Sequence, residues 1–263
     1  MKFASLGSGS EGNALLVTAS VAASSDCSAA TTVMVDCGFA VREAERRLRR
    51  AGVEAQSISA IFVTHEHSDH VGGAFKLARK YRIPVYLSQG TWQAVRGDTD
   101  GVEVILCRDS TPVDIGNLRL IPYTVPHDAR EPLQCVLEEA GQRLGVLTDA
   151  GHATAHMIAM LDACDALLLE YNHDPRMLAE SSYPTFLKQR IAGDHGHLSN
   201  QASAAILAAI DRSRLKTVVA AHLSRKNNSP ELAMAAMLGV IADGSVALSC
   251  ACQDVGFDWI DVG

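Results

Sequence analysis

Four residues in one short segment, His65, His67, Asp69 and His70, carry side chains that can bind a divalent metal. Imidazole nitrogens and carboxylate oxygens are donors that zinc and manganese accept. An apolar run over residues 58–63 predicts a strand just before them, so His65 and His67 should point to the same side. Asp69 and His70 follow where a helix is expected to begin. The spacing therefore predicts ligands for two neighbouring metal ions.

The alternative interpretation of this segment is a solvated loop before a helix, in which Ser68 or Asp69 accepts a hydrogen bond from the first helical turn. A single histidine here would favour that interpretation. Three histidines and an aspartate at this spacing favour a metal site.

Further ligand-type residues follow later predicted strands: His127, Asp149, Glu170 and His222. The strands before them are expected over residues 118–125, 143–147, 166–169 and 217–221. Each residue alone could be an ordinary polar side chain at the start of a loop. Because strand ends present side chains to a cleft, their repetition indicates one site shared with the 65–70 segment.

The remaining pattern predicts the layers that position this site. Further strands are expected over residues 2–6, 14–19, 32–35, 84–87, 102–107, 112–115, 133–138 and 246–250, the last one being the final strand. Helices are expected over 42–50, 74–81, 91–95, 154–161, 200–210 and 230–241. A small-residue loop, 7–13, is either a tight turn or a backbone that approaches the site, and 20–30 is expected to be a surface insertion. This order predicts one α/β domain, residues 1–263, as a four-layer αβ/βα sandwich of two mixed sheets with helices on the outer faces.

Composition narrows the classes of partner. The chain has 263 residues, is 48% hydrophobic, and carries a net charge of −7. That charge argues against general attraction to nucleic acid but leaves room for a local basic patch. The sequence shows no export signal and no stretch long enough to span a bilayer, which favours a cytoplasmic protein without membrane contact. Its seven scattered cysteines are expected to be structural thiols.

The order His-x-His-x-Asp-His at 65–70 resembles the motif of the metallo-β-lactamase-fold superfamily. The resemblance implies one metal held by His65, His67 and His127, a second held by Asp69, His70 and His222, and a bridge through Asp149. True β-lactamases typically carry Ser or Cys in the Asp149 motif, so the aspartate indicates the branch that contains nucleases and phosphodiesterases.

Four segments narrow the resemblance to the WalJ/YycJ-like group, and they span residues 5–13, 170–174, 196–200 and 222–228. That group implies a metal-dependent 5′ to 3′ DNA exonuclease. Glu170 with His197 also resembles the Glu–His pair of tRNA 3′-processing enzymes, where the pair helps to protonate the leaving group.

These resemblances imply a phosphodiesterase with two divalent ions, zinc or manganese with iron as a third option, and a metal-bridging hydroxide as nucleophile. Asp69 would orient that hydroxide, and His197, positioned by Glu170, would act as general acid. Phosphate contacts are expected from Ser199, Ser224, Arg225 and Asn228, with ordinary loop capping as the alternative for each. Surface or supporting roles are expected for His152, His156, His173 and His195.

Two other functions remain open from the sequence. One is a hydrolase of small molecules such as a cyclic phosphodiester, a lactone or a thioester, which the acidic balance favours. The other is a non-catalytic metal-binding regulatory protein, which would not need a complete two-metal ligand set. The expected partner is DNA or another phosphodiester, and the oligomeric state stays open.

Overall fold

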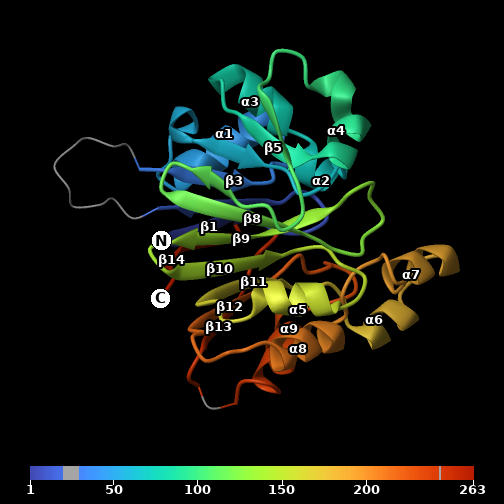
Figure 1. The fold of residues 1–263 in the computed structure, drawn as a ribbon. Coiled ribbons are helices and arrows are strands. Elements are labelled where there is room, and N and C mark those ends of the chain that lie inside the picture. Colours follow the sequence, from blue (N-terminus) through green and yellow to red (C-terminus); the bar gives the residue numbers. More distant parts are fainter. Residues whose placement is uncertain (20–29, 243) are drawn as a thin grey trace.

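Two facing β-sheets with helices outside form the molecule (Figure 1), in a computed structural model that describes residues 1–19, 30–242 and 244–263. The first sheet has the order β14-β1-β2-β3-β4-β5-β6. Its strands are β1 Lys2–Gly7, β2 Ala14–Thr18, β3 Thr32–Val35, β4 Ala60–Phe62, β5 Val85–Ser88, β6 Val104–Cys107 and β14 Phe257–Asp261. The insertion predicted over 20–30 falls almost entirely outside the described residues.

The second sheet has the order β13-β12-β11-β10-β9-β8-β7. Its strands are β7 Val113–Ile115, β8 Leu118–Thr124, β9 Leu133–Glu139, β10 Gln142–Leu147, β11 Ala166–Glu170, β12 Thr217–Ala221 and β13 Ala247–Cys250. Both sheets contain parallel and antiparallel pairs, so both are mixed, as predicted.

Helices cover the outer face of each sheet (Figure 1). On the first sheet lie α1 Val41–Arg50, α3 Ala74–Tyr81 and α4 Gln89–Val95; on the second lie α5 Ala155–Leu161, α8 Asn200–Ala209 and α9 Pro230–Leu238. Three short helices, α2 Ser68–Val71, α6 Pro175–Glu180 and α7 Thr185–Ile191, lie at the edge, and 3₁₀ turns occupy Ala55–Ser57 and Arg96–Asp98. The predicted four-layer αβ/βα sandwich is confirmed.

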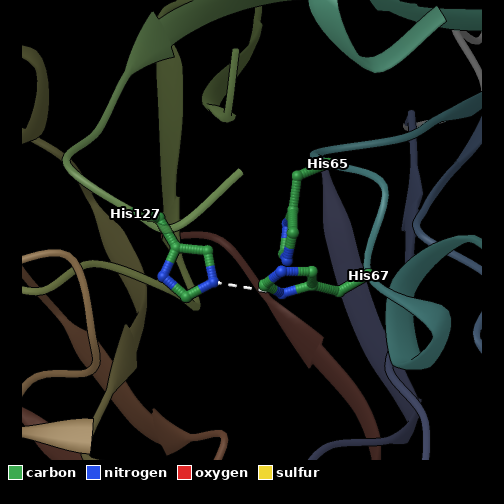
Figure 2. A group of neighbouring side chains, drawn as sticks. All are labelled: His65, His67 and His127. Carbon is green, nitrogen blue, oxygen red and sulfur yellow. Dashed lines mark hydrogen bonds between the residues drawn. The ribbon is translucent and has the colours of Figure 1, made fainter. Parts of the chain in front are cut away.

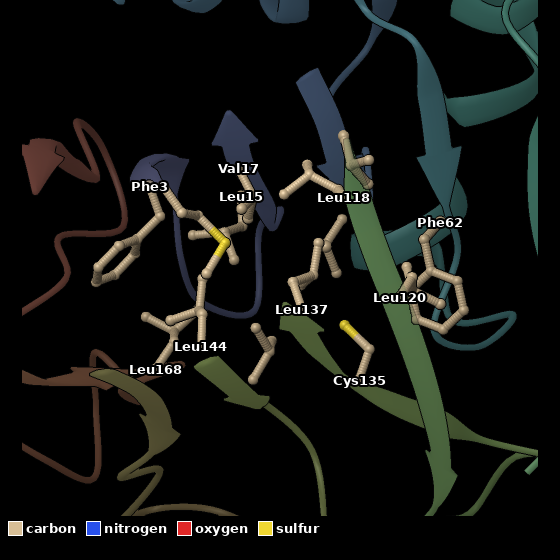
Figure 3. Packing of buried hydrophobic residues seen from close by; sticks show 14 of the residues in the cluster. Phe3, Leu15, Val17, Phe62, Leu118, Leu120, Cys135, Leu137, Leu144 and Leu168 are labelled. Atoms are coloured by element: carbon tan, nitrogen blue, oxygen red, sulfur yellow. The ribbon is translucent and has the colours of Figure 1, made fainter. Parts of the chain in front are cut away.

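Strand periodicity explains the layers. In β12, Val219 and Ala221 pack into the core between the sheets, while Val218 and Ala220 pack against the outer helices. Both faces of this strand are apolar because both are covered. The inter-sheet core also contains Phe3 from β1 and other side chains from both sheets (Figure 3). Burial of this apolar surface fixes the two sheets face to face.

One prediction about the elements is wrong, and two helices were not predicted. The strand at 247–250 is not the last, because β14 follows it and pairs antiparallel with β1, Lys2 opposite Asp261. The pairing partner lies at the other end of the chain, so no local pattern announced it, and the pairing brings the two termini together (Figure 1). Helices α6 and α7 were also missed. Helix α7 has no buried residue and therefore no apolar periodicity for the sequence to show.

Strand direction gathers the ligand-bearing loops. β8 and β10 are both antiparallel to β9, and β10, β11 and β12 are parallel, so β8, β10, β11 and β12 end at the same edge. In the first sheet β3 and β4 are parallel and likewise end together. The loops after these strands form one edge of the sandwich.

Candidate metal centre

The first group of donors is a triad of histidines, His65, His67 and His127. Figure 2 shows the three rings turned toward one another, and Nε2 of His127 lies 3.3 Å from Nδ1 of His67. His65 is fully buried, and its Nε2 has no hydrogen-bond partner among the residues that the structure describes. Burial, followed by the neighbouring charge of His70, holds the pKa of His65 below the usual imidazole value, which favours the neutral form that binds metal.

The second group is a triad of Asp69, His70 and His222. Oδ2 of Asp69 lies 3.4 Å from Nε2 of His70 and 3.5 Å from Nε2 of His222. Burial raises the pKa of Asp69, but hydrogen bonds from His222 and His70 outweigh it and hold that pKa well below its usual value. The carboxylate therefore stays ionised and available as a ligand.

Asp149 lies between the two triads. One carboxylate oxygen, Oδ2, is 3.2 Å from Nε2 of His70, and the other, Oδ1, is 3.9 Å from Nε2 of His127. The side chain is buried, and Oδ2 makes no hydrogen bond within the described residues. A buried carboxylate oxygen without a partner is costly unless a cation neutralises it.

The donor set fits divalent metal. His65 Nε2 and Asp149 Oδ2 are buried atoms without a hydrogen bond among the described residues, and both residues belong to the donor groups. Nitrogen and carboxylate donors at this density suit zinc or manganese. Burial lowers the pKa of His70, but Asp149 and Asp36 outweigh it and raise that pKa well above the usual value. Metal must displace that proton, so metal affinity should fall in acid.

Two candidate ligand histidines from the first sheet's loops are oriented by side chains. Nδ1 of His70 is 2.7 Å from Oδ2 of Asp36, and Nδ1 of His65 is 3.0 Å from Oγ1 of Thr64. Asp36 also accepts hydrogen bonds from the backbone and hydroxyl of Thr64. Such partners fix the ring orientation and leave Nε2 for the metal.

Two candidate ligand histidines from the second sheet's loops are oriented by backbone carbonyls. Nδ1 of His127 is 2.9 Å from the carbonyl oxygen of Gly196, and Nδ1 of His222 is 2.8 Å from that of Thr148. A Cβ at Gly196 would lie 2.2 Å from the carbonyl oxygens of Arg190 and Ile191, so this close approach requires glycine.

The loop over residues 7–13 reaches the site through two side chains. Ser8 Oγ accepts a hydrogen bond from the backbone N–H of His222, and Asn13 Nδ2 lies 3.4 Å from Oδ2 of Asp69. The loop is a tight turn between β1 and β2, with Gly9 and Gly12 at positive φ. It therefore turns tightly and also approaches the metal centre, where the backbone N–H of Asn13 donates a hydrogen bond to the carbonyl oxygen of Asp69 at 2.8 Å.

Glu170 and His197 form a pair beside the two triads. Oε1 of Glu170 is 2.8 Å from Nδ1 of His197, and the other oxygen accepts hydrogen bonds from the backbone N–H groups of Ala150 and Leu198. Glu170 is fully buried, whereas His197 is partly exposed. With Nδ1 engaged by the carboxylate, Nε2 is the nitrogen that remains for a substrate.

The four expected phosphate contacts do not gather at the centre as one group. Ser199 Oγ caps α8 by accepting from the N–H of Ala202. Asn228 is buried, and its amide is engaged by Asn200 and by the carbonyl of Tyr171. These bonds argue against phosphate contacts by Ser199 and Asn228, because their polar groups already have internal partners.

The other two expected contacts lie in the loop after His222. Ser224 Oγ accepts a hydrogen bond from the backbone N–H of Asn227. Arg225 is exposed and pairs with Asp254 and Glu11. The Ser224 side chain therefore caps its own loop, and two carboxylates already compensate the charge of Arg225.

Of the remaining histidines, three lie away from the donors. His152 and His195 are exposed, and His156 is paired with Asp109. His173 is buried at 3% exposure, so a surface position for it is wrong. Its backbone instead bridges to Ser199 and supports the loop that carries His197.

An open cleft of about 390 Å³ leads to the donors. It is lined by Ser10, His67, Ser68, Asp69, Asp149, Tyr183, Leu187, Arg190, Ile191, His197 and His222. Sequence reasoning missed the wall contributed by residues 183–191, and it missed the supporting roles of Asp36 and Asn13. Asp36 could have been flagged as a carboxylate directly after a strand, like Asp149, whereas nothing in the pattern marked Tyr183.

Comparison with known families defines the class. Residues 31–223 match the model of the β-lactamase superfamily domain, and the chain belongs to this superfamily. It is a hydrolase of the metallo-β-lactamase fold, whose His and Asp clusters can hold metal. Among solved structures, the YhfI protein of Bacillus subtilis superposes with a TM-score of 0.71 at 14% identity, covering 99% of each chain. The short form of human tRNase Z superposes at 0.65 and 17% identity over 100% of each chain.

More similar in sequence are two bacterial proteins. The chain is 32% identical to exodeoxyribonuclease YycJ of Bacillus anthracis over 92% of this chain and 90% of that protein. It is 31% identical to exodeoxyribonuclease WalJ of Streptococcus pneumoniae over 94% and 90%. The predicted resemblance to the WalJ/YycJ-like group is confirmed.

No helix among the described residues is long and apolar enough to cross a membrane.

Proposed function

We propose that the protein is a two-metal phosphodiesterase that removes nucleotides from the 5′ end of DNA. The observation that carries this proposal is the position of Asp149 between two complete donor triads, in the lining of an open cleft. The first triad would hold one divalent ion and the second triad the other, with Asp149 shared. When bound, two such ions supply positive charge for the phosphate oxygens and a water of lowered pKa.

The chain's own residues would prepare the site for this chemistry. Asp69 and Asp149 place two carboxylates among five histidines, so the charge of two divalent ions is partly offset and substrate phosphate can still be attracted. Asp69 is the more exposed of these two carboxylates, since 21% of its side chain is exposed and it lines the cleft. It is suited to accept a hydrogen bond from the attacking water and orient it.

Protonation of the leaving group would fall to His197. Its Nδ1 is held by Glu170, and it lines the cleft beside Asp149 and His222. Protonated at Nε2, the imidazole can donate to the sugar oxygen that departs when the P–O bond breaks. The buried carboxylate of Glu170 keeps the ring in one orientation, as carboxylate partners of catalytic histidines do.

DNA is proposed as the substrate because the chain aligns over nearly its whole length with proteins named exodeoxyribonucleases. The end-directed reaction is proposed on the same alignment, because both relatives are named exodeoxyribonucleases.

The test combines metal analysis with defined substrates. Protein purified without chelator should contain close to two metal equivalents, and with manganese it should release nucleotides stepwise from the 5′ end of a linear DNA strand. A circular single strand of the same sequence is the matched control and should resist cleavage. A single equivalent that added metal does not raise would refute the two-metal centre, and rapid cutting of the circle would refute the exonuclease assignment.

A further inference from the structure

Tyr183 brings an aromatic ring to the cleft that contains the metal ligands. It lines the same cavity as Asp69, Asp149 and His197, and it is only partly buried. It stands just before α7, in the segment whose sequence gave no sign of a functional role. An aromatic ring in the lining of this cleft offers a flat apolar surface that the metal donors do not provide.

Lys226 accompanies this ring. Its ammonium lies 5.3 Å from the centroid of the Tyr183 ring, and the side chain is exposed. Two other cations nearby are already compensated, because Arg190 pairs with Asp128 and Arg225 pairs with Asp254 and Glu11. No carboxylate pairs with Lys226 within the part of the chain that the structure describes. In a protein with a net charge of −7, this is a local positive charge beside the cleft.

The segment over residues 183–191, which forms one wall of the cleft, is held in place through α7. Arg190 donates a hydrogen bond to Oδ2 of Asp128 at 2.6 Å, and Asp128 directly follows the metal ligand His127. Leu187 and Ile191 face the same cleft as Tyr183. The wall is thus tied to the loop of a metal ligand, which fixes its distance from the donors.

We propose that Tyr183 and Lys226 form a binding site for one nucleotide of the DNA strand, with the base stacked on the tyrosine ring and a neighbouring phosphate on the ammonium. Proteins hold single strands by this combination of aromatic platforms and cationic side chains. When a terminal nucleotide enters the cleft, its base loses the stacking contact with the neighbouring base. The tyrosine ring replaces that contact. The inference rests on the proposed function, because it assigns the substrate contacts of that same site.

The first experiment asks whether a base is recognised. KM is measured for Tyr183→Ala and Tyr183→Phe on a linear single strand, on a strand of equal length with abasic residues at its 5′ end, and on a nitrophenyl phosphodiester. Loss of one base stack is expected to raise KM of Tyr183→Ala for the normal strand by about 5- to 150-fold. In Tyr183→Ala, KM for the abasic strand and turnover of the nitrophenyl ester should stay unchanged. Tyr183→Phe, which keeps the ring, should have the normal KM for the unmodified strand.

Phe186 provides the matched control, since it lies on the same segment, is 72% exposed and does not line the cleft. Phe186→Ala should leave KM unchanged. An equal rise of KM on normal and abasic strands, or an equal rise in Phe186→Ala, would overturn the base site. If the unaltered protein turns over the nitrophenyl ester but no DNA, the proposed function itself fails; if it degrades DNA and Tyr183→Ala is normal, only this site fails.

The second experiment asks whether Lys226 meets a phosphate. Each phosphate contact on a single strand contributes about 0.7 to the slope of log affinity against log salt. Lys226→Gln should therefore lower the salt dependence of KM by about that amount. Lys216→Gln is the control, because Lys216 is exposed and precedes β12 at the end remote from His222. An unchanged slope in Lys226→Gln, or the same change in Lys216→Gln, would overturn the phosphate contact.

Discussion

The N-terminal half of the molecule, which carries residues 65–70, and the C-terminal half, which carries His127, Asp149 and His222, orient their candidate metal ligands by different means. In the first half, a carboxylate and a hydroxyl, Asp36 and Thr64, hold the rings of His70 and His65. In the second half, the carbonyl oxygens of Gly196 and Thr148 hold the rings of His127 and His222. Side chains can be exchanged one at a time, whereas a backbone carbonyl moves only with its loop. The difference shows that equivalent ligand positions can depend on sequence at one side of a site and on loop geometry at the other.

The same contrast extends to how the ligands are supplied. The first half supplies four within one segment, residues 65–70, after β4. The second half supplies one per strand end, after β8, β10 and β12. Both halves nevertheless contribute to each triad, so neither can form a metal site alone.

The largest effect is expected from loss of a ligand in either half. Asp69→Ala and His222→Ala each remove one member of the second triad, and each should lower kcat/KM by on the order of 10³-fold or more. Metal analysis should fall toward one equivalent in both variants. For Asp69→Ala, circular dichroism should report an intact fold, since that side chain is partly exposed. Near-normal activity of either variant at saturating metal would contradict its role as a ligand.

The next effect concerns a group that only the second half contributes. His197→Ala should retain both metals but cleave an ordinary DNA phosphodiester about 10²- to 10⁴-fold more slowly, because a positioned acid contributes that much. A nitrophenyl phosphodiester should lose far less rate, since its leaving group needs little protonation. Equal losses on the two substrates would show that His197 does not act as the acid.

A smaller effect should separate the two means of orientation. Asp36 accepts hydrogen bonds from Thr64 and His70, more than one amide oxygen can satisfy, so Asp36→Asn should cost about 10- to 100-fold in metal affinity or activity. Metal titration by calorimetry measures this. Asp165→Asn is the control, because Asp165 is also buried but pairs with Arg214 away from the donors. A drop in metal affinity for both variants would mean that Asp36 acts only through stability.

The smallest effect concerns stability outside the site. Helix α1 is tied by ion pairs of Glu43 with Arg46 and Arg47, and the hydrogen bond from Arg46 is the main cause that lowers the pKa of Glu43 to about 2. Since the unfolded carboxyl titrates near 4.3, this stabilisation is complete above that pH and is lost as the pH falls toward 2. Because Glu43 is about one-third exposed, the pair should contribute less than about 1 kcal/mol.

Thermal unfolding of Glu43→Gln between pH 6 and pH 3 tests this contribution. The variant should be slightly less stable than the unaltered protein at pH 6, and the difference should shrink toward pH 3. As a control in the C-terminal half, Glu180→Gln removes an exposed partner of Arg176 and should leave the unfolding temperature at pH 6 nearly unchanged. If the stability difference between Glu43→Gln and the unaltered protein grows as the pH falls, the stabilising role assigned to the Glu43 ion pairs is wrong.

Sequence alone was sufficient for the parts of the molecule in which local spacing carries the information. Residues 65–70 indicated candidate metal ligands because four donors stand together, and continuous apolar runs indicated the strands because both faces of a strand such as β12 are covered. The positions of His127, Asp149, Glu170 and His222 followed from one recurring pattern, a ligand-type residue directly after a strand.

Tertiary structure decided what depends on residues far apart in the chain. β14 was missed because its partner is β1, and α7 was missed because a helix without buried residues has no apolar period. Asp36 and the carbonyl of Gly196 became supports of the metal ligands only when the sheets packed face to face. Ser199 and Asn228 looked like phosphate contacts until the fold supplied their internal hydrogen bonds. A sequence names the donors and acceptors, but only packing decides which of them find partners inside the protein and which remain for a substrate.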